Sequence, residues 1–323
     1  MDAPEIGILG AGAFGTALAV ALGQGGRRVA LWARDPLLAE AMQRERSNAA
    51  RLPGATLPAQ VSPTASLADA LAAPVILLAV PTQQLRALCS QAAEGLAGKP
   101  AIACCKGVEL GTGLLPTEII AACAPGARAG VLTGPSFAAD IAQGKPTALT
   151  LALEGPEGAA VQELLSTRNL RLYLSHDLIG AQMGGALKNV IAIAAGICIG
   201  ADLGESARAA LMTRGMAEMA RLAQGRGAQP ETLWGLSGFG DLVLTCTSQK
   251  SRNFSHGLAI GAGAAPDATK TVEGVMTAHA LAQTAQGADL PITSMVSALL
   301  RGEVDLEQAK TQLLSRPLRR EIG

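Results

Sequence analysis

Residues 6–19 read Ile-Gly-Ile-Leu-Gly-Ala-Gly-Ala-Phe-Gly-Thr-Ala-Leu-Ala and decide the fold of the N-terminal half. The apolar run Ile6–Leu9 predicts a buried parallel strand, and the Ala- and Leu-rich residues that follow predict a helix. Between them stand Gly10, Gly12 and Gly15, with the spacing Gly-x-Gly-x-x-Gly. In this setting the first glycine permits a tight turn, the second lets the backbone approach a pyrophosphate, and the third lets helix and strand pack closely. The stretch therefore favours dinucleotide binding over an ordinary glycine turn.

The composition narrows the class of protein. A chain of 323 residues is long enough for two domains. Its formal net charge is +0, so nothing indicates binding to nucleic acid or to an anionic membrane. The six cysteines form no Cys-x-x-Cys pair and lie in apolar runs, which favours buried thiols over disulfides or metal ligands. The apolar stretch Val190–Ile199 is too short to span a bilayer, and Asp2 and Glu5 argue against a signal peptide. We therefore expect a cytoplasmic protein without a metal or a membrane segment.

Strand and helix patterns alternate up to His176 and only helix patterns follow. The expected strands cover residues 6–9, 28–35, 75–80, 101–105, 129–132, 147–153 and 170–174. The expected helices of the second half cover residues 178–199, 207–224, 272–286, 292–300 and 306–314. This predicts an α/β protein, with a Rossmann-type doubly wound sheet over residues 1–177 and an all-helical domain over residues 178–323. Ligands bind beyond the carboxyl ends of such strands, so the segments that follow them should face one crevice. Pro81 ends one strand, and Thr82 is expected to cap the next helix.

Arg34 and Asp35 end the second expected strand, about 20 residues beyond the glycines, where such folds meet the adenosine ribose. An acidic side chain there favours NAD through the ribose 2′-hydroxyl, whereas an arginine can hold the 2′-phosphate of NADP. Because both side chains are present, the sequence leans to NADP or to use of both cofactors. The alternative is a solvated pair of charges.

Three segments of the second half could carry chemistry. Lys188 lies in a nearly uncharged helix, where burial would lower its pKa and make it a usable proton donor or acceptor. Asp241 follows a glycine turn and could cap a helix, orient Lys188, or both. The polar segment 249–253, expected to be a loop, offers an arginine fork with neutral donors, which suits a phosphate monoester as well as plain solvation. No catalytic triad or metal-ligand spacing is visible.

Seven segments, in order, resemble bacterial NAD(P)-dependent glycerol-3-phosphate dehydrogenase. They are residues 10–19, 106–109 (Lys-Gly-Val-Glu), 134–137 (Gly-Pro-Ser-Phe), 185–190 (Gly-Ala-Leu-Lys-Asn-Val), 240–246 (Gly-Asp-Leu-Val-Leu-Thr-Cys), 251–253 (Ser-Arg-Asn) and 272–274 (Val-Glu-Gly). The resemblance implies reversible hydride transfer between NAD(P)H and dihydroxyacetone phosphate. The product, sn-glycerol 3-phosphate, would supply phospholipid synthesis, and the enzyme would be a homodimer.

The resemblance also assigns roles to residues. Lys188 would be the general acid/base, Asp241 the acid that holds it, and Lys106 a catalytic contact to substrate and cofactor. The implied substrate-binding residues are Lys106, Gly134, Ser136, Lys188, Asp241, Ser251, Arg252 and Asn253. The implied cofactor-binding residues are Gly10, Gly12, Ala13, Phe14, Gly15, Arg34, Lys106, Ala138, Arg252, Thr271 and Glu273. Three positions depart from the family pattern: Phe14 replaces Trp or Tyr, Ala13 replaces a frequent Ser, and Thr271 replaces Val.

Two other functions compete with this one. The fold also resembles 2-ketopantoate and β-hydroxyacid reductases, which share the glycine turn and a lysine in the helical domain. The segment 251–253 argues for a phosphorylated substrate instead of a bare carboxylate. A non-catalytic NAD(P) sensor is the second alternative, and it would not need Lys188 or Asp241. The sequence does not decide whether residues 247–253 form a lid over the site.

Overall fold

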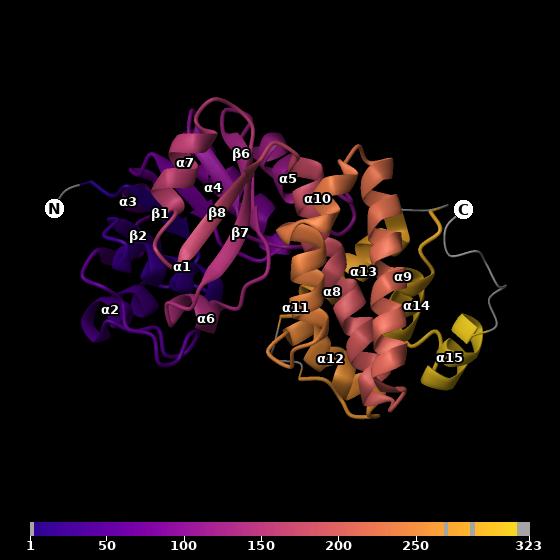
Figure 1. Cartoon of the computed structure of the whole chain (residues 1–323). Helices are drawn as coiled ribbons and strands as arrows, with labels where there is room; N and C mark the ends of the chain where they lie inside the picture. Colours follow the sequence, from indigo (N-terminus) through magenta and orange to yellow (C-terminus); the bar gives the residue numbers. More distant parts are fainter. Residues whose placement is uncertain (1–2, 268–270, 285–287, 315–323) are drawn as a thin grey trace.

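A computed structural model describes residues 3–267, 271–284 and 288–314. Figure 1 shows a half built on a sheet (indigo to magenta) beside a half built of helices (orange to yellow). The strands are β1 (Ile6–Leu9), β2 (Val29–Trp32), β3 (Val61–Thr64), β4 (Val75–Leu78), β5 (Pro100–Ala103), β6 (Arg128–Thr133), β7 (Thr147–Leu153) and β8 (Leu170–Ser175). Their order in the sheet is β3-β2-β1-β4-β5-β6-β7-β8, and neighbours are parallel except β6 and β7. The expected mostly parallel α/β sheet followed by a helical part is confirmed.

Helices cover both faces of the sheet, which is why the central strands β1, β2, β4 and β5 are buried at every position. Alternate strand residues join different cores: Leu77 of β4 packs in one cluster, while its neighbours Ile76 and Leu78 pack in the other. The helices of this half are α1 (Ala13–Gln24), α2 (Pro36–Glu45), α3 (Leu67–Leu71), α4 (Thr82–Leu96), α5 (Pro116–Cys123), α6 (Ala138–Ala142) and α7 (Gly158–Leu165).

Three local expectations about this half are wrong. Strand β3 was not expected, because Pro63 interrupts its pattern; proline is tolerated there because β3 lies at the edge of the sheet. The strands expected over residues 75–80 and 101–105 end earlier, at Leu78 and Ala103. Thr82 does not cap α4: Pro81 holds the cap position, and Thr82 is the first helical residue.

The helical half is built around α8 (Leu178–Gly200), which is buried along nearly its whole length. Around it lie α9 (Gly204–Gly225), α10 (Pro230–Trp234), the π-helix η1 (Leu236–Gly240), α11 (Asp241–Cys246), α12 (Arg252–Gly261), α13 (Glu273–Thr284) and α14 (Pro291–Leu300). The last helix, α15 (Leu306–Leu314), contacts α14 at the outer side of this half (Figure 1). The elements α10, η1 and α12 lie outside the expected helices. The helix that Asp241 was expected to cap is α11, but Gly240 holds the N-cap position and Asp241 is the first helical residue. The helix expected over residues 272–286 corresponds to α13, which is described from Glu273 to Thr284, and positions 285 and 286 lie outside the described residues.

The segment 249–253 is only partly the loop that was expected. Ser251 caps α12 by accepting a hydrogen bond from the Phe254 amide (3.2 Å), so Arg252 and Asn253 form the first turn of that helix. Helix α12 lies directly against α8. A side chain at Gly257 would meet the Ile193 carbonyl oxygen at 2.0 Å, so glycine is required for this backbone contact. The close packing holds the first turn of α12 at a defined place along α8.

Two further expectations concern apolar residues. Helix α8 is long and apolar enough to cross a membrane by length and composition, although the stretch within it was judged too short. However, 89% of its apolar window is buried inside the protein, as in the core helix of a globular domain. All six cysteines are free thiols; five are buried and Cys123 is half-buried. The expectation of thiols without disulfides is confirmed.

Candidate active site

The glycine turn between β1 and α1 fits a dinucleotide pyrophosphate. Gly10 has a φ of +122°, and a side chain there would lie 2.6 Å from the Ala79 carbonyl oxygen. At Gly15 a side chain would collide with the Gly10 carbonyl oxygen at 2.0 Å, whereas at Gly12 it would meet only open space. Gly12 is also the N-cap of α1 and lends it no side-chain hydrogen bond, so the first amides of the helix are available to an anion. Each glycine therefore has the property that its expected task requires.

Asn48 supports this turn and was missed by the sequence analysis. Its side-chain amide is buried and donates to the Ala11 carbonyl (2.9 Å) and to the Thr16 hydroxyl (2.8 Å). These two partners flank the turn and the start of α1. The residue follows α2, 37 positions after Ala11, and no motif in the sequence marks it.

Two lysines from different halves of the molecule meet on one carboxylate. Asp241, the first residue of α11, accepts a bond from Lys188 Nζ of α8 at 3.0 Å and from Lys106 Nζ at 2.7 Å. Each lysine takes a different carboxylate oxygen. Lys106 follows β5, in the segment beyond the carboxyl ends of the parallel strands. The side chain of Asp241 is only 1% exposed, so its charge acts on both ammonium groups with little screening by water.

The neutral side chain of Thr245 is hydrogen-bonded to both Lys188 and Asp241, and it is absent from the expected site residues. Lys188 Nζ donates to its hydroxyl at 2.6 Å, and the hydroxyl donates to Asp241 Oδ1 at 3.3 Å. Thr245 lies four residues after Asp241 in the same helix, so the two side chains share one face. That spacing is the signal by which the sequence could have identified it.

Burial determines the acidity of Lys188. The surrounding protein lowers the pKa of the Lys188 ammonium to about 8; Asp241 opposes this shift, and the second cation, Lys106, adds to it. A group with such a pKa can give up and regain a proton near neutral pH. Gly185, one turn before Lys188, has no room for a side chain because the Thr133 hydroxyl would lie 2.5 Å from it. Helix α8 therefore approaches the end of β6 closely at this point.

The Lys106 segment is held from several sides. Lys106 Nζ also donates to the Gly134 carbonyl (2.8 Å), and its own carbonyl accepts from the Asn189 side chain (2.9 Å). Glu273, at the start of α13, accepts from the Lys106 amide (3.4 Å) and the Thr82 amide (3.3 Å). Glu273 therefore links the helical half to the ends of β4 and β5.

Three residues further on, Glu109 anchors the same segment to α4. Arg86 forms a two-pronged bond to it, with distances of 2.8 and 2.7 Å. The Arg86 guanidinium holds the pKa of the Glu109 carboxyl below its usual range. This contact holds the Lys106 segment against α4.

The residues expected to bind phosphate lie at the start of α12. Arg252 is exposed there, and Asn253 is engaged with its neighbours: it donates to Asn189 Oδ1 (2.9 Å) and accepts from the Gly274 amide (3.0 Å). Across the molecule, Gly134 has a φ of +132° and leads to Ser136, whose hydroxyl donates to the Gly134 carbonyl (3.2 Å). The chain of contacts from Asn253 through Asn189 to Lys106 joins these residues to the lysine pair.

The remaining expected cofactor residues lie near the glycine turn or beside α13. Asp35 caps α2 by accepting from the Leu37 amide (3.0 Å), whereas its neighbour Arg34 is exposed. Phe14 and Ala138 are half-buried in one apolar cluster between α1 and α6, and Ala13 is half-buried at the start of α1. Thr271 is exposed two positions before Glu273. The carboxyl ends of β1, β2, β4, β5 and β6 all lie at one edge of the sheet, which brings most of these positions together.

Comparison with known proteins agrees with this geometry. Residues 5–159 match the family model for the N-terminus of NAD-dependent glycerol-3-phosphate dehydrogenase, and residues 177–311 match the model for its C-terminus. The chain is 58% identical to "Glycerol-3-phosphate dehydrogenase [NAD(P)+]" of Roseobacter denitrificans, over 98% of this chain and 100% of that protein. It is 59% identical to the protein of that name from Cereibacter sphaeroides, with the same coverage.

Solved structures show the same relationship. The crystal structure of glycerol-3-phosphate dehydrogenase from Coxiella burnetii superposes with a TM-score of 0.91 at 36% identity, over 97% of this chain and 99% of that one. A ketopantoate reductase from Ralstonia eutropha superposes with a TM-score of 0.60 at 18% identity, over 95% of this chain and 99% of that one. At that identity the second match shows a shared fold alone.

Proposed function

The chain belongs to the NAD-dependent glycerol-3-phosphate dehydrogenase family, and on that premise we propose how its residues carry out the reaction. The reaction is the NAD(P)-dependent reduction of dihydroxyacetone phosphate to sn-glycerol 3-phosphate, and its reverse. NAD(P)H, when bound, supplies the hydride. The protein must therefore deliver a proton to the carbonyl oxygen and hold the phosphate group of the substrate.

Lys188 delivers that proton in our proposal. The observation that carries this assignment is the pair of lysines on the buried Asp241, because it combines a buried proton donor of suitable pKa with a second cation beside it. As the carbonyl oxygen gains negative charge, the Lys188 ammonium protonates it and the Lys106 ammonium stabilises it. Asp241 keeps Lys188 charged until transfer. In the reverse direction, neutral Lys188 removes the hydroxyl proton of glycerol 3-phosphate.

This role predicts opposite pH dependences for the two directions. Reduction requires the protonated ammonium, so its kcat/KM should fall as the pH rises through about 8, the pKa of Lys188 in the ligand-free protein. Oxidation requires the neutral amine, so its kcat/KM should rise over the same range. Profiles of kcat/KM measured in both directions test this. A reduction rate that stays constant through the pKa of Lys188 would contradict the assignment.

Arg252, with Ser251 and Asn253, is proposed to bind the phosphate of the substrate. A guanidinium at the exposed start of α12 offers two parallel donors to a phosphate, and the helix N-terminus favours an anion. Gly134 and Ser136 would contact the same substrate from the sheet half. Ala13, Phe14, Arg34, Ala138, Thr271 and Glu273 are proposed to contact the cofactor. Because Asp35 is engaged in capping α2, we propose that Arg34 meets the ribose and allows use of NADP as well as NAD.

Initial rates of NADPH and NADH oxidation with dihydroxyacetone phosphate test the proposed function, with ketopantoate as the competing substrate. In the Arg252→Ala variant, KM for dihydroxyacetone phosphate should rise by roughly tenfold or more, because hydrogen bonds to a charged group are lost. The rate with unphosphorylated dihydroxyacetone should stay unchanged. Arg221→Ala is a matched control, since Arg221 on α9 donates to the Asp289 carbonyl just before α14, outside the site. Equal losses with both substrates would contradict phosphate binding by Arg252.

We further propose a homodimer that works in the cytoplasm and supplies phospholipid synthesis, with the boundary between its two domains at residues 177 and 178. The +0 formal charge and the burial of α8 support a protein that does not insert into membranes. The cap that Asp177 provides to α8 supports the boundary, because the helical half begins there (Gly180 amide to Asp177, 2.8 Å). Light scattering of the purified protein tests the dimer.

A further inference from the structure

A single lysine connects the two halves of the molecule close to the proposed phosphate site. Lys250 Nζ lies 3.2 and 3.5 Å from the two carboxylate oxygens of Asp140. It also lies 5.9 Å from the centre of the Phe137 ring, within the range of a cation–π contact. Lys250 belongs to the helical half, just before α12, whereas Asp140 and Phe137 belong to α6 and its N-cap in the sheet half.

Each end of this contact is adjacent to residues that are proposed to hold the substrate. Phe137 follows Ser136 directly, and Lys250 directly precedes Ser251. The turn that carries Lys250 is ordered by its own hydrogen bonds: the Ser251 amide donates to the Ser248 carbonyl (3.0 Å), and the Ser255 hydroxyl donates to the Gln249 carbonyl (2.6 Å). The position of Lys250 is therefore coupled to that of the first turn of α12.

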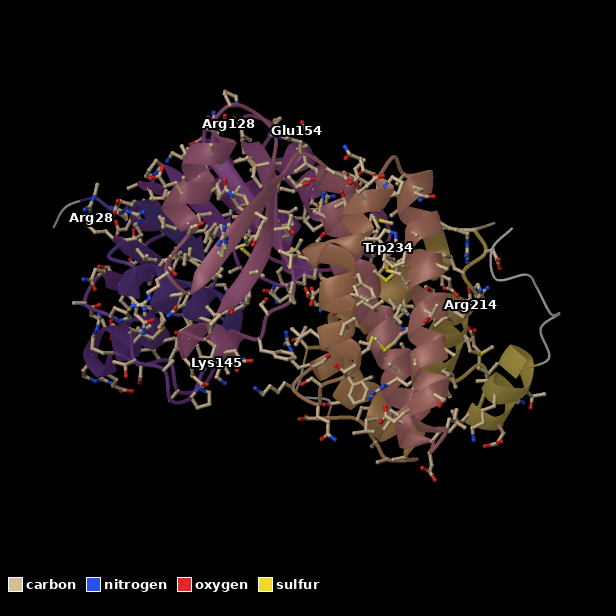
Figure 2. All side chains as sticks on the ribbon, viewed as in Figure 1. Arg28, Arg128, Lys145, Glu154, Arg214 and Trp234 are labelled. Atoms are coloured by element: carbon tan, nitrogen blue, oxygen red, sulfur yellow. The ribbon has the colours of Figure 1, made fainter. Side chains whose placement is uncertain are left out.

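Asp140 has a second cationic partner that does not cross between the halves. Lys145 Nζ lies 2.8 Å from Asp140 Oδ1, and Figure 2 shows Lys145 on the sheet half, at the side of α6. Both lysines lower the pKa of the Asp140 carboxyl, with the hydrogen bond from Lys145 the larger cause. The same carboxylate thus accepts one bond from within its own half and one from the other half.

We propose that Lys250 is a positioning residue, which holds the phosphate-binding turn of α12 against the Gly134–Ala138 segment through Asp140 and Phe137. This inference rests on the proposed function, because it names dihydroxyacetone phosphate as the substrate held between the two segments. Its consequence lies in substrate affinity, since Lys250 does not contact the lysine pair on Asp241. Loss of the contact should raise KM and leave kcat little changed.

A simpler mechanism must be distinguished from this one. Lys250 is a cation near a site for a phosphate dianion, so its removal would weaken substrate binding by charge alone. The two mechanisms predict opposite changes in substrate affinity when the charge of Asp140 is removed. Removing the negative charge of Asp140 improves binding of an anion if only charge matters, but weakens it if Asp140 holds Lys250 in place. Removing the charge of Lys145 also distinguishes the two mechanisms. If Lys250 acts by its charge alone, loss of the Lys145 charge should also raise KM. If Lys250 acts by positioning, loss of the Lys145 charge should leave KM unchanged.

The experiment compares KM for dihydroxyacetone phosphate among Lys250→Gln, Asp140→Asn, their double variant and Lys145→Gln, at low and high salt. We expect about a two- to fivefold rise in KM for each of the first two, which is the range for an exposed ion pair. The double variant should show no further rise, because the same contact is lost only once. Lys145→Gln should keep the wild-type KM, and high salt should reduce all differences.

Specific results would overturn the proposal. A lower or unchanged KM in Asp140→Asn, or an equal rise in Lys145→Gln, would mean that Lys250 acts by its charge alone. Additive rises of KM in the double variant would mean that Lys250 and Asp140 act independently of their mutual contact. The wild-type protein in the same assay keeps the two claims separate: absence of turnover with dihydroxyacetone phosphate contradicts the proposed function. Normal turnover with an unchanged KM in Lys250→Gln contradicts only the positioning role.

Discussion

Replacing Lys188 by methionine is expected to lower kcat for dihydroxyacetone phosphate reduction by about 10²–10⁴-fold, the usual contribution of general acid catalysis. Methionine fills the space of the buried side chain in α8 but cannot donate a proton. Affinity for NADPH should change little, because Lys188 bonds to Asp241 and Thr245 and lies apart from the glycine turn. Steady-state rates and a fluorescence titration with NADPH measure the two quantities.

Lys188→Arg distinguishes proton transfer from simple electrostatic stabilisation. Arginine keeps the positive charge beside Asp241 but does not release a proton at accessible pH. If Lys188 transfers the proton, the arginine variant should be almost as inactive as the methionine variant. A kcat within about tenfold of wild type, which is a difference of about 1.4 kcal/mol in activation free energy, would assign Lys188 an electrostatic role instead.

Replacing Asp241 by asparagine should have the second largest effect, because Asp241 is the shared partner of two ammonium groups. Removal of one member of a buried ion pair leaves the other without a counter-charge, at a cost on the order of 3 kcal/mol in the free energy of unfolding. Activity should fall as well. Since Asp241 raises the pKa of Lys188 against the effect of burial, the decline of the reduction rate should begin at lower pH than in wild type.

The pH profile separates this role from a purely structural one. Asp177→Asn is the matched control: Asp177 is also a buried carboxylate that binds α8, through the Gly180 amide (2.8 Å), but it caps the N-terminus of the helix, whereas Lys188 lies near its middle. It should affect stability without moving the pH profile. A profile for Asp241→Asn that coincides with wild type would contradict the coupling between Asp241 and Lys188.

Much of the fold could be predicted because its signals are local. The glycine spacing in residues 10–15 follows from the shape of one turn, and the apolar runs of β1 and β7 have the bounds that were expected. The elements that were missed lack such signals. Strand β3 contains Pro63, and α10 and η1 span five residues each, too few for a helical period to show.

The sequence by itself determined the nucleotide-binding turn, the alternation of strands and helices followed by a helical half, and the presence of one lysine in an apolar helix. Only the tertiary structure decided that Lys106 and Asp241, 135 positions apart, share one ion pair. The same holds for the contact of Asn48 with the glycine turn and for that of Lys250 with Asp140. The physical reason is that periodicity and turn chemistry depend on neighbours within a few residues. Contacts between distant segments depend on which strand edges and helix faces pack together once the core has formed.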